Sequence, residues 1–283
     1  MRFDQATIEQ IRANQANWDN RAPIHVASTF YGIDDPSRQA EDWFGPFEWD
    51  DLGDLHGRDL IHLQCHLGTE TIAFARNGAS TIGLDFSRES IVAAQRIAGK
   101  DGVDVEYVQA DVYDATTALP GRQFDIVYTG KGALCYLPDL PGWATVIADL
   151  LRPGGRVYIV EFHPVLQSLS PKPAPGDGPE LVLRNDYLEG RGAVEHDATF
   201  TYTDGPALQD ATRAYEWTHG LGEVITALVN AGLTITRLRE TNLLPWRRWD
   251  RMIRDNSHWW RLPDTDPRIP LLYALTATKP PTG

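Results

Sequence analysis

The sequence is poor in cysteine, with only Cys65 and Cys135 among its 283 residues. Both cysteines are isolated in apolar or strand-end contexts, so they form neither a disulfide framework nor the ligand set of a zinc site. The glycine fingerprint GxGxxG of dinucleotide-binding loops is also absent. These absences exclude a disulfide-stapled scaffold and disfavour a nicotinamide-dependent enzyme.

Long apolar runs and an excess of positive charge are lacking as well. No segment is long enough to cross a bilayer, and residues 1–5 do not resemble a secretion signal, so we expect a cytoplasmic protein. Lys and Arg number 26 against 39 Asp and Glu, a formal net charge of -13. This charge disfavours partners such as nucleic acid or an anionic membrane and leaves a small molecule as the expected partner. The sequence does not fix the oligomeric state, and a homodimer is compatible with it.

Residues 59–76 contain the pattern of a buried strand, a tight turn and a helix. The apolar run from Leu60 to Leu63 ends in small and polar residues, and helical spacing follows from Leu67. Such a turn presents the free N–H groups and the positive dipole end of a helix to an anionic group of a ligand. A second strand ends in Asp85, where a carboxylate can accept hydrogen bonds from both hydroxyls of a ribose.

Strands and helices then alternate with short connections. Strands are expected over 59–64, 80–85, 104–109, 124–128 and 156–162, and helices over 68–77, 88–99 and 139–151. A helix over 4–18 and the polar-aromatic segment 18–32 precede them and are expected to lie over the sheet as a cap. The alternation predicts a parallel sheet with its ligand at the carboxyl ends of the strands.

The periodicity changes after residue 162. A proline- and glycine-rich loop covers 170–179, and period-two alternation over 198–203 and 212–217 predicts an antiparallel insertion. A helix over 221–231 and strands over 233–240 and 271–279 complete the chain. We therefore expect an N-terminal cap at 1–50, a core at 51–163 and 216–283, and an inserted lid at 164–215.

Five βα units, Gly154-Gly155 before the fifth strand, and a final helix with two strands resemble the class I S-adenosylmethionine-dependent methyltransferases. The text at Tyr136-Leu137-Pro138-Asp139 and from Glu161 to Pro164 is similar to small-molecule methyltransferases of type 11. The resemblance implies an α/β, Rossmann-like seven-stranded sheet whose last strand is antiparallel, with a helical cap and a small antiparallel β insertion. It also implies S-adenosylmethionine as the cofactor.

The resemblance assigns cofactor contacts to the ends of the first four strands. Asp85 corresponds to the ribose-binding acid, Asp111 to the carboxylate near adenine N6, and residues 129–132 to the active-site loop. The first motif departs from the family, because His62, Gln64, His66 and Gly68 stand where an acid and three glycines are usual, so the turn must form with side chains in place. The implied cofactor-binding residues are Trp18, Gln64, Cys65, His66, Gly68, Asp85, Phe86, Ser87, Asp111, Val112, Thr129 and Gly130.

Methyl transfer is an in-line displacement that depends on positioning, and it needs a base only if the acceptor must lose a proton. The expected catalytic residues are Glu161, His163, His219, Tyr31 and His25. Glu161 and His163 share a face if the strand is still extended there. The alternatives are that Glu161 hydrogen-bonds the cap, that His163 caps the next loop, and that His219 only follows a capping Thr218.

Other candidates have plainer interpretations. His62 and His66 have i, i+4 spacing on a strand and turn rather than a helix, so no metal site is expected. Lys131 is a candidate for binding an acceptor carboxylate or is simply solvated. The arginines between 247 and 261 predict a solvated helix face or an anion site.

Aromatic side chains are the main clue to the acceptor. They come from the cap, the insertion and the connection 243–262, three segments expected to meet over the strand ends: Trp18, Tyr31, Trp43, Tyr202, Tyr215, Trp217, Trp246, Trp249, Trp259 and Trp260. Aromatic walls suit a flat acceptor such as an indole or a phenol. The sequence therefore predicts C-, N- or O-methylation of a small aromatic metabolite. The alternatives are a cofactor-binding partner protein without catalysis and an NAD-dependent oxidoreductase.

Overall fold

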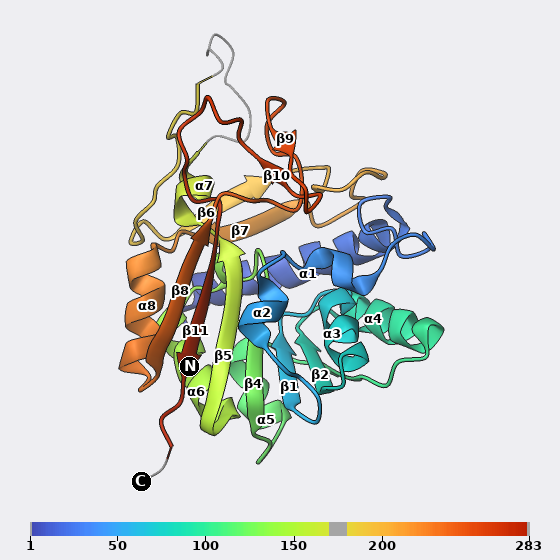
Figure 1. Ribbon diagram of the computed structural model, residues 1–283, viewed down its shortest axis with the longest axis vertical. Coiled ribbons are helices and arrows are strands. Elements are labelled where there is room, and N and C mark those ends of the chain that lie inside the picture. The colour runs from blue at the N-terminus through green and yellow to red at the C-terminus, as the bar shows by residue number, and fades with distance from the viewer. Residues whose placement is uncertain (1, 170–179, 282–283) are drawn as a thin grey trace.

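A seven-stranded sheet in the order β3-β2-β1-β4-β5-β11-β8 forms the centre of the molecule (Figure 1). The computed structural model describes residues 2–169 and 180–281. The strands are β1 (Asp59–Leu63), β2 (Ser80–Asp85), β3 (Glu106–Gln109), β4 (Phe124–Thr129), β5 (Leu151–Phe162), β8 (Thr234–Thr241) and β11 (Leu272–Thr278). The last strand, β11, is antiparallel to both β5 and β8, while the pairs among β1 to β5 are parallel. The predicted Rossmann-like sheet with an antiparallel last strand is thus confirmed.

Two layers of helices cover the faces of the sheet, because side chains alternate along each strand. Ile61 and its neighbours pack against α6 (Leu140–Leu150) and α8 (Leu221–Asn230), with Trp143 fully buried between them. Leu60 packs on the other face against α2 (Glu48–Leu52) and α3 (Thr69–Arg76). The helix α4 (Arg88–Asp101) extends this second layer. The short elements are η1 (Ala40–Trp43), η2 (Val112–Asp114), α5 (Ala115–Ala118) and η3 (Leu134–Tyr136).

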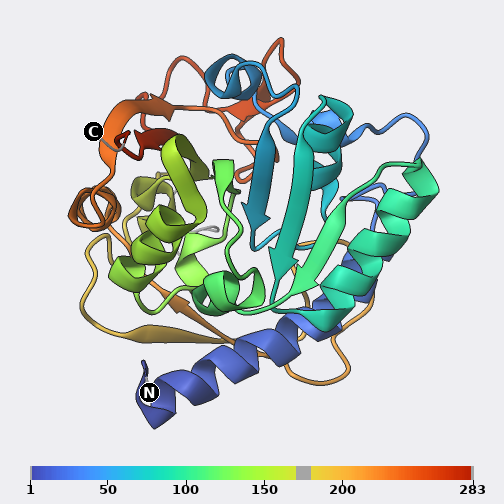
Figure 2. The ribbon, with the colours of Figure 1, turned by 90° about the horizontal axis from the view of Figure 1, so that it is seen from below.

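The remaining elements gather at the carboxyl ends of the parallel strands. The helix α7 (Pro164–Ser168) follows β5 directly, and the ribbon of β6 (Ala193–Asp197) and β7 (Arg213–Trp217) lies beside it (Figure 1). The hairpin of β9 (Ile253–Arg254) and β10 (Trp260–Arg261) lies at the same end. The long helix α1 (Gln5–Ala27) runs alongside α4 and contacts β7 (Figure 2). These segments enclose the end of the sheet where the sequence places the ligand.

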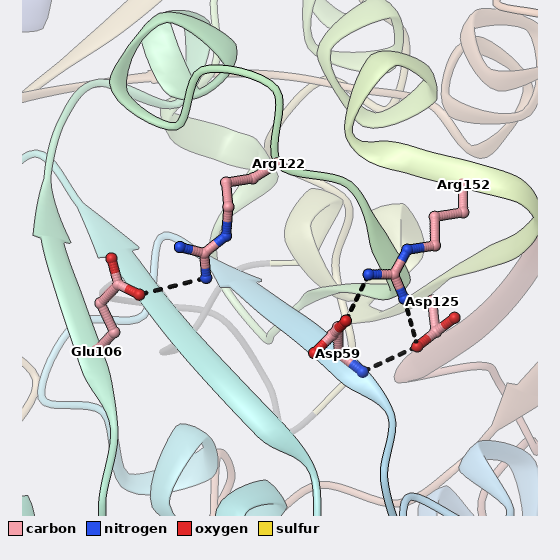
Figure 3. Close-up of polar contacts among 5 residues, drawn as sticks. All are labelled: Asp59, Glu106, Arg122, Asp125 and Arg152. Carbon is pink, nitrogen blue, oxygen red and sulfur yellow. Dashed lines mark hydrogen bonds and ion pairs between the residues drawn. The ribbon is translucent and has the colours of Figure 1, made fainter.

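The amino ends of the strands carry ion pairs instead (Figure 3). Arg152 bridges Asp59 and Asp125, with Nη1 3.0 Å from Asp125 Oδ2, and Arg122 lies 3.3 Å from Glu106. Asp59 and Asp125 share Arg152, Glu106 pairs with Arg122, and pairs so exposed contribute little stability. These three carboxylates are therefore already paired with arginines.

Three predicted elements are wrong in position. The helix α1 continues through Pro23 to Ala27, so the aromatic segment predicted to follow it is helical over much of its length. The first strand of the insertion is β6 at 193–197 rather than 198–203. Residues after it lie instead against the segment that follows α1, where Asp204 accepts hydrogen bonds from the N–H groups of Thr29 and Phe30 at 3.0 Å each. The fifth strand begins at Leu151, five residues early.

The arginine-rich connection also differs from the prediction. It contains the β9–β10 hairpin and no helix, so its arginines are not aligned by i, i+4 spacing. The predicted loop at 170–179 lies outside the described residues. The predicted division into cap, core and lid stays a prediction.

Candidate active site

The turn between β1 and α3 has an unusual backbone, because two residues with side chains take the left-handed conformation. Gln64 has φ +57° and His66 has φ +48°. This conformation strains residues other than glycine by about 1–2 kcal/mol. Gln64 Nε2 compensates by donating to Ala133 O at 3.0 Å, and the His66 N–H donates to Asp85 Oδ2 at 2.9 Å. The turn therefore keeps its shape with side chains where glycines were expected.

Gly68 is the position in this turn where a side chain does not fit. Its φ is +71°, and an added Cβ would lie 2.3 Å from the hydroxyl oxygen of Tyr107. It begins α3 as the N-cap residue. The glycine that the sequence retains is thus the one that the packing requires.

Two carboxylates lie at the tips of neighbouring strands. Asp85 ends β2 and accepts hydrogen bonds from the N–H groups of His66 and Ser87, the second at 2.8 Å. Burial nevertheless raises the pKa of Asp85 to about 6. Asp111 follows β3, accepts from the Tyr113 N–H at 3.0 Å, and has a pKa raised by burial. Both side chains face one cavity.

This cavity has a volume of about 400 Å³ and lies among the turn, the two carboxylates and the covering segments. Ten of the predicted site residues line it: Trp18, Tyr31, Gln64, Cys65, His66, Asp85, Phe86, Asp111, Val112 and Gly130. Ser87 lies behind this wall as the N-cap of α4, as the sequence predicts, with its hydroxyl accepting from the Ser90 N–H. Thr129 ends β4 and is fully buried.

Five of the ten aromatic residues expected to meet over the strands line the cavity: Trp18, Tyr31, Trp43, Tyr202 and Trp246. They come from α1 and the segment after it, from the insertion and from the connection after β8. The hydroxyl groups of Tyr31 and Tyr202 are hydrogen-bonded at 2.6 Å. Desolvation raises the pKa of Tyr31 well above its ordinary value and that of Tyr202 to about 12, although Tyr202 is 55% exposed, and both phenols are protonated at neutral pH.

His25 belongs to a chain of hydrogen bonds beneath this wall. Its Nδ1 lies 2.8 Å from His66 Nε2 and its Nε2 lies 2.6 Å from Thr201 Oγ1, while His66 Nδ1 lies 3.0 Å from Ser90 Oγ. Burial lowers the pKa of His25 to about 3 and that of His66 well below its ordinary value. Both rings are therefore neutral at pH 7, and all four ring nitrogens are already hydrogen-bonded. His25 does not itself line the cavity.

Glu161 lies under the active-site loop rather than in the cavity. Its two oxygens accept hydrogen bonds from the N–H groups of Gly132, Ala133 and Leu134 at 2.6–3.0 Å and from Phe162 at 2.6 Å. Burial raises its pKa, and these four bonds oppose that effect. The arrangement holds the active-site loop, and these hydrogen bonds do not come from the cap, the alternative considered from the sequence.

The other two predicted catalytic histidines are also engaged away from the cavity. His163 is the N-cap of α7, accepting from the Val165 N–H, and its Nε2 lies 2.9 Å from Glu240. His219 lies 2.8 Å from both Glu223 and the carbonyl oxygen of Leu137. Helix α8 begins after Gly220, so Thr218 is not its N-cap. Neither histidine is among the residues that line the cavity.

His62 is buried on the floor of the cavity. Its Nδ1 lies 2.9 Å from Thr71 Oγ1, and burial lowers its pKa to about 4. Among the described residues, no group of three or more His, Cys, Asp or Glu side chains could hold a metal ion.

Glu48, which lies beside the site, is not indicated by any pattern in the sequence, while Arg248 belongs to the arginine-rich segment already considered as an anion site. Glu48 is fully buried and lies 2.9 Å from Lys131 Nζ, which also donates to Trp43 O at 3.1 Å. Lys131 is thus neither solvated nor free. Arg248 lines the far end of the cavity. Glu48 could not have been identified without the fold, because 83 residues separate it from its partner.

Known proteins share a domain and a fold with this chain. Residues 61–157 match the family described as "Methyltransferase domain". The chain is 34% identical over 110 residues to the ubiquinone biosynthesis O-methyltransferase of Aeromonas salmonicida, a match that covers 39% of this chain and 45% of that protein. The Salmonella arizonae protein of the same name is 34% identical over 106 residues, which is 38% of this chain and 43% of the relative. The matched segment thus spans less than half the length of these curated relatives.

Solved structures share the fold over most of the chain. An S-adenosylmethionine-dependent methyltransferase from Mesorhizobium loti superposes with a TM-score of 0.58 at 23% identity, covering 87% of this chain and 100% of that one. Magnesium protoporphyrin IX methyltransferase from Synechocystis PCC 6803, solved with bound S-adenosylhomocysteine (SAH), has a TM-score of 0.52 at 16% identity and covers 98% of this chain and 100% of that one. Residues 61–157 thus match a methyltransferase domain, and the chain has the fold of S-adenosylmethionine-dependent methyltransferases.

Proposed function

We propose that this chain transfers a methyl group from S-adenosylmethionine to a small aromatic metabolite. The observation that carries the proposal is that Asp85 and Asp111, at neighbouring strand tips, face the same cavity as the first turn. Two such carboxylates suit the ribose hydroxyls and the adenine amino group of the cofactor. Gln64 Oε1, which is buried and has no hydrogen-bond partner among the described residues, suits the cofactor's amino group.

The cofactor supplies the electrophilic methyl carbon, and the chain supplies position and exclusion of water. Trp18, Tyr31 and Trp43 come from the N-terminal segment, while Tyr202 and Trp246 approach from the other covering segments. A flat acceptor fits between such aromatic walls, and aligning it with the methyl group lowers the barrier substantially.

The Tyr31–Tyr202 pair is proposed to orient the acceptor. Within the pair one hydroxyl donates to the other, so one O–H proton stays available for an acceptor oxygen or nitrogen. The neutral imidazoles of His25 and His66 keep this wall in place rather than taking a proton, because their nitrogens are already occupied. The proposed catalysis therefore depends on positioning rather than on a general base.

The test is transfer of label from isotopically labelled S-adenosylmethionine to a panel of indoles, phenols and amines. We expect label in at least one aromatic acceptor. The variant Tyr31→Phe should lower kcat/KM about 10- to 100-fold through the lost hydrogen bond while leaving SAH affinity unchanged. Cofactor binding without transfer to any member of the panel would instead favour a cofactor-binding partner protein.

Partners other than a small molecule find little support. The net charge of -13 disfavours nucleic acid. Within the described residues, no helix combines the length and apolarity needed to cross a membrane.

A further inference from the structure

Arg248 lies where the connection after β8 meets the end of β5. This end of the cavity is lined by Phe162, Leu166, Gln167, Pro245, Trp246 and Arg248. The rings of Phe162 and Trp246 meet edge to face, with centroids 4.7 Å apart. An aromatic wall and a guanidinium group thus border the same part of the cavity.

Three of the four other arginines in this connection have carboxylate partners, and the fourth, Arg254, donates to the carbonyl oxygen of His258. Arg248 has no carboxylate partner among the residues that the structure describes. Arg251 lies 3.0 Å from Asp266 and Arg261 lies 2.6 Å from Asp264, while Arg247 lies 3.9 Å from Asp250. Arg248 Nη2 donates to the carbonyl oxygens of Leu166 and Leu169 at 3.5 and 3.2 Å. Its Nε is buried without a hydrogen-bond partner in the described part of the chain.

Among the described residues that line the cavity, Lys131 is the other Lys or Arg, and it is neutralised by Glu48 at 2.9 Å. A partly buried guanidinium without a carboxylate is costly, and in a chain with 39 acidic residues such a lack is unexpected. Burial alone lowers the pKa of Arg248, with no acidic group opposing it. A negatively charged group of a ligand can therefore pair with Arg248.

We propose that Arg248 binds a carboxylate of the methyl acceptor, so that the substrate is an aromatic acid rather than a neutral arene. This inference rests on the proposed function and adds the chemical class of its substrate. The Nε–H of Arg248 is a donor without a partner on a positively charged planar group, and a carboxylate oxygen can satisfy both the donor and the charge. The aromatic part of the acid then lies against Trp246 and Phe162.

The experiment measures binding of paired aromatic acids and amides by calorimetry in the presence of saturating SAH. The pairs are indole-3-acetate with indole-3-acetamide and 4-hydroxybenzoate with 4-hydroxybenzamide. At least one acid should bind 10- to 100-fold more tightly than its amide, the size expected for hydrogen bonds between charged groups. Arg248→Met should abolish that preference and leave SAH affinity unchanged.

Arg247→Met is the matched control, because Arg247 is exposed and pairs with Asp250, and it should keep the preference. If Arg248→Met fails to fold, Arg248→Lys is the deciding variant. It keeps the positive charge without the planar group, so it should reduce the preference for the acid over the amide without removing it. Equal affinity for acids and amides, binding of SAH without any acid, or a preference that survives in Arg248→Met overturns the proposal. Failure of SAH itself to bind removes the proposed function, and this inference with it.

Discussion

The imidazole rings of His25 and His66 are in direct hydrogen-bonding contact, with Nδ1 of the first 2.8 Å from Nε2 of the second. The contact joins α1 to the turn after β1, and Thr201 extends it into the insertion. One buried pair thus links the covering segments to a turn that holds two strained residues.

Replacing His25 with Phe should keep a ring in this place and lose both hydrogen bonds. Leaving His66 Nε2 and Thr201 Oγ1 without partners should lower the free energy of unfolding by about 1–3 kcal/mol for each group that stays buried. Chemical denaturation measures the loss. The control is His56→Phe at an exposed histidine, and an equal loss there would contradict this role of His25.

The same pair makes stability dependent on pH. The folded-state pKa of His25, about 3, is below its unfolded value near 6.5, so the unfolded chain binds more protons between these values. The free energy of unfolding should therefore fall as pH drops from about 6.5 towards 3, by up to about 1.4 kcal/mol per pH unit for each such histidine. In His25→Phe the slope of the free energy of unfolding against pH should be smaller by the contribution of one histidine. An unchanged slope would show that His25 does not titrate in this way.

Glu161→Gln should destabilise the active-site loop. Its amide NH2 would face two of the four N–H groups that now donate hydrogen bonds to Glu161, and these two bonds would be lost. We expect a loss of about 2–4 kcal/mol in stability and a 10- to 100-fold fall in kcat, with SAH affinity nearly unchanged. The pH profile of kcat/KM separates this role from that of a base. If the original protein shows a fall in kcat/KM at low pH and the variant does not, Glu161 acts as a base, contrary to this account.

The Lys131–Glu48 pair should couple the active-site loop to the segment before β1. Lys131→Met leaves a fully buried carboxylate without its cation and should cost about 3–5 kcal/mol. Adding Glu48→Gln to that variant should recover part of the loss. A double-mutant cycle by thermal or chemical unfolding measures the coupling, and strictly additive effects would contradict it.

Much of this architecture could be predicted because it depends on local patterns. Apolar runs ending in Asp85 or at the start of the active-site loop located the strands, and Ser87 marked the start of α4 correctly. The ligand-facing ends of the strands follow from this alternation alone. For the same reason ten predicted site residues line the cavity.

The parts that could not be predicted depend on contacts between distant segments. Glu161 and His163 do lie at a strand end, but whether such a side chain faces a ligand or a backbone loop is decided by residues 132–134 and by Glu240. The first strand of the insertion lies earlier than predicted because residues after 197 contact α1 through Thr201 and the segment after α1 through Asp204. The sequence alone does not distinguish Arg248 from Arg251 and Arg261, because only the fold pairs these two with Asp266 and Asp264.

Cofactor affinity should depend on the ionisation of Asp85. With a pKa of about 6, this carboxyl is protonated below that pH and then accepts hydrogen bonds less well from His66, Ser87 and a ribose. The Kd for SAH should be flat above pH 6 and rise by up to about tenfold per unit below it. In Asp85→Asn the affinity should be low at every pH, and a normal pH dependence in that variant would assign the titration to another group.

The most direct test of the account is calorimetric titration of the chain with SAH at pH 7.5. We predict one saturable site per chain and a loss of about 100-fold or more in affinity in Asp85→Ala, which removes charged acceptors from the ribose. Absence of SAH binding, together with tight binding of a nicotinamide dinucleotide at the same cavity, would contradict it.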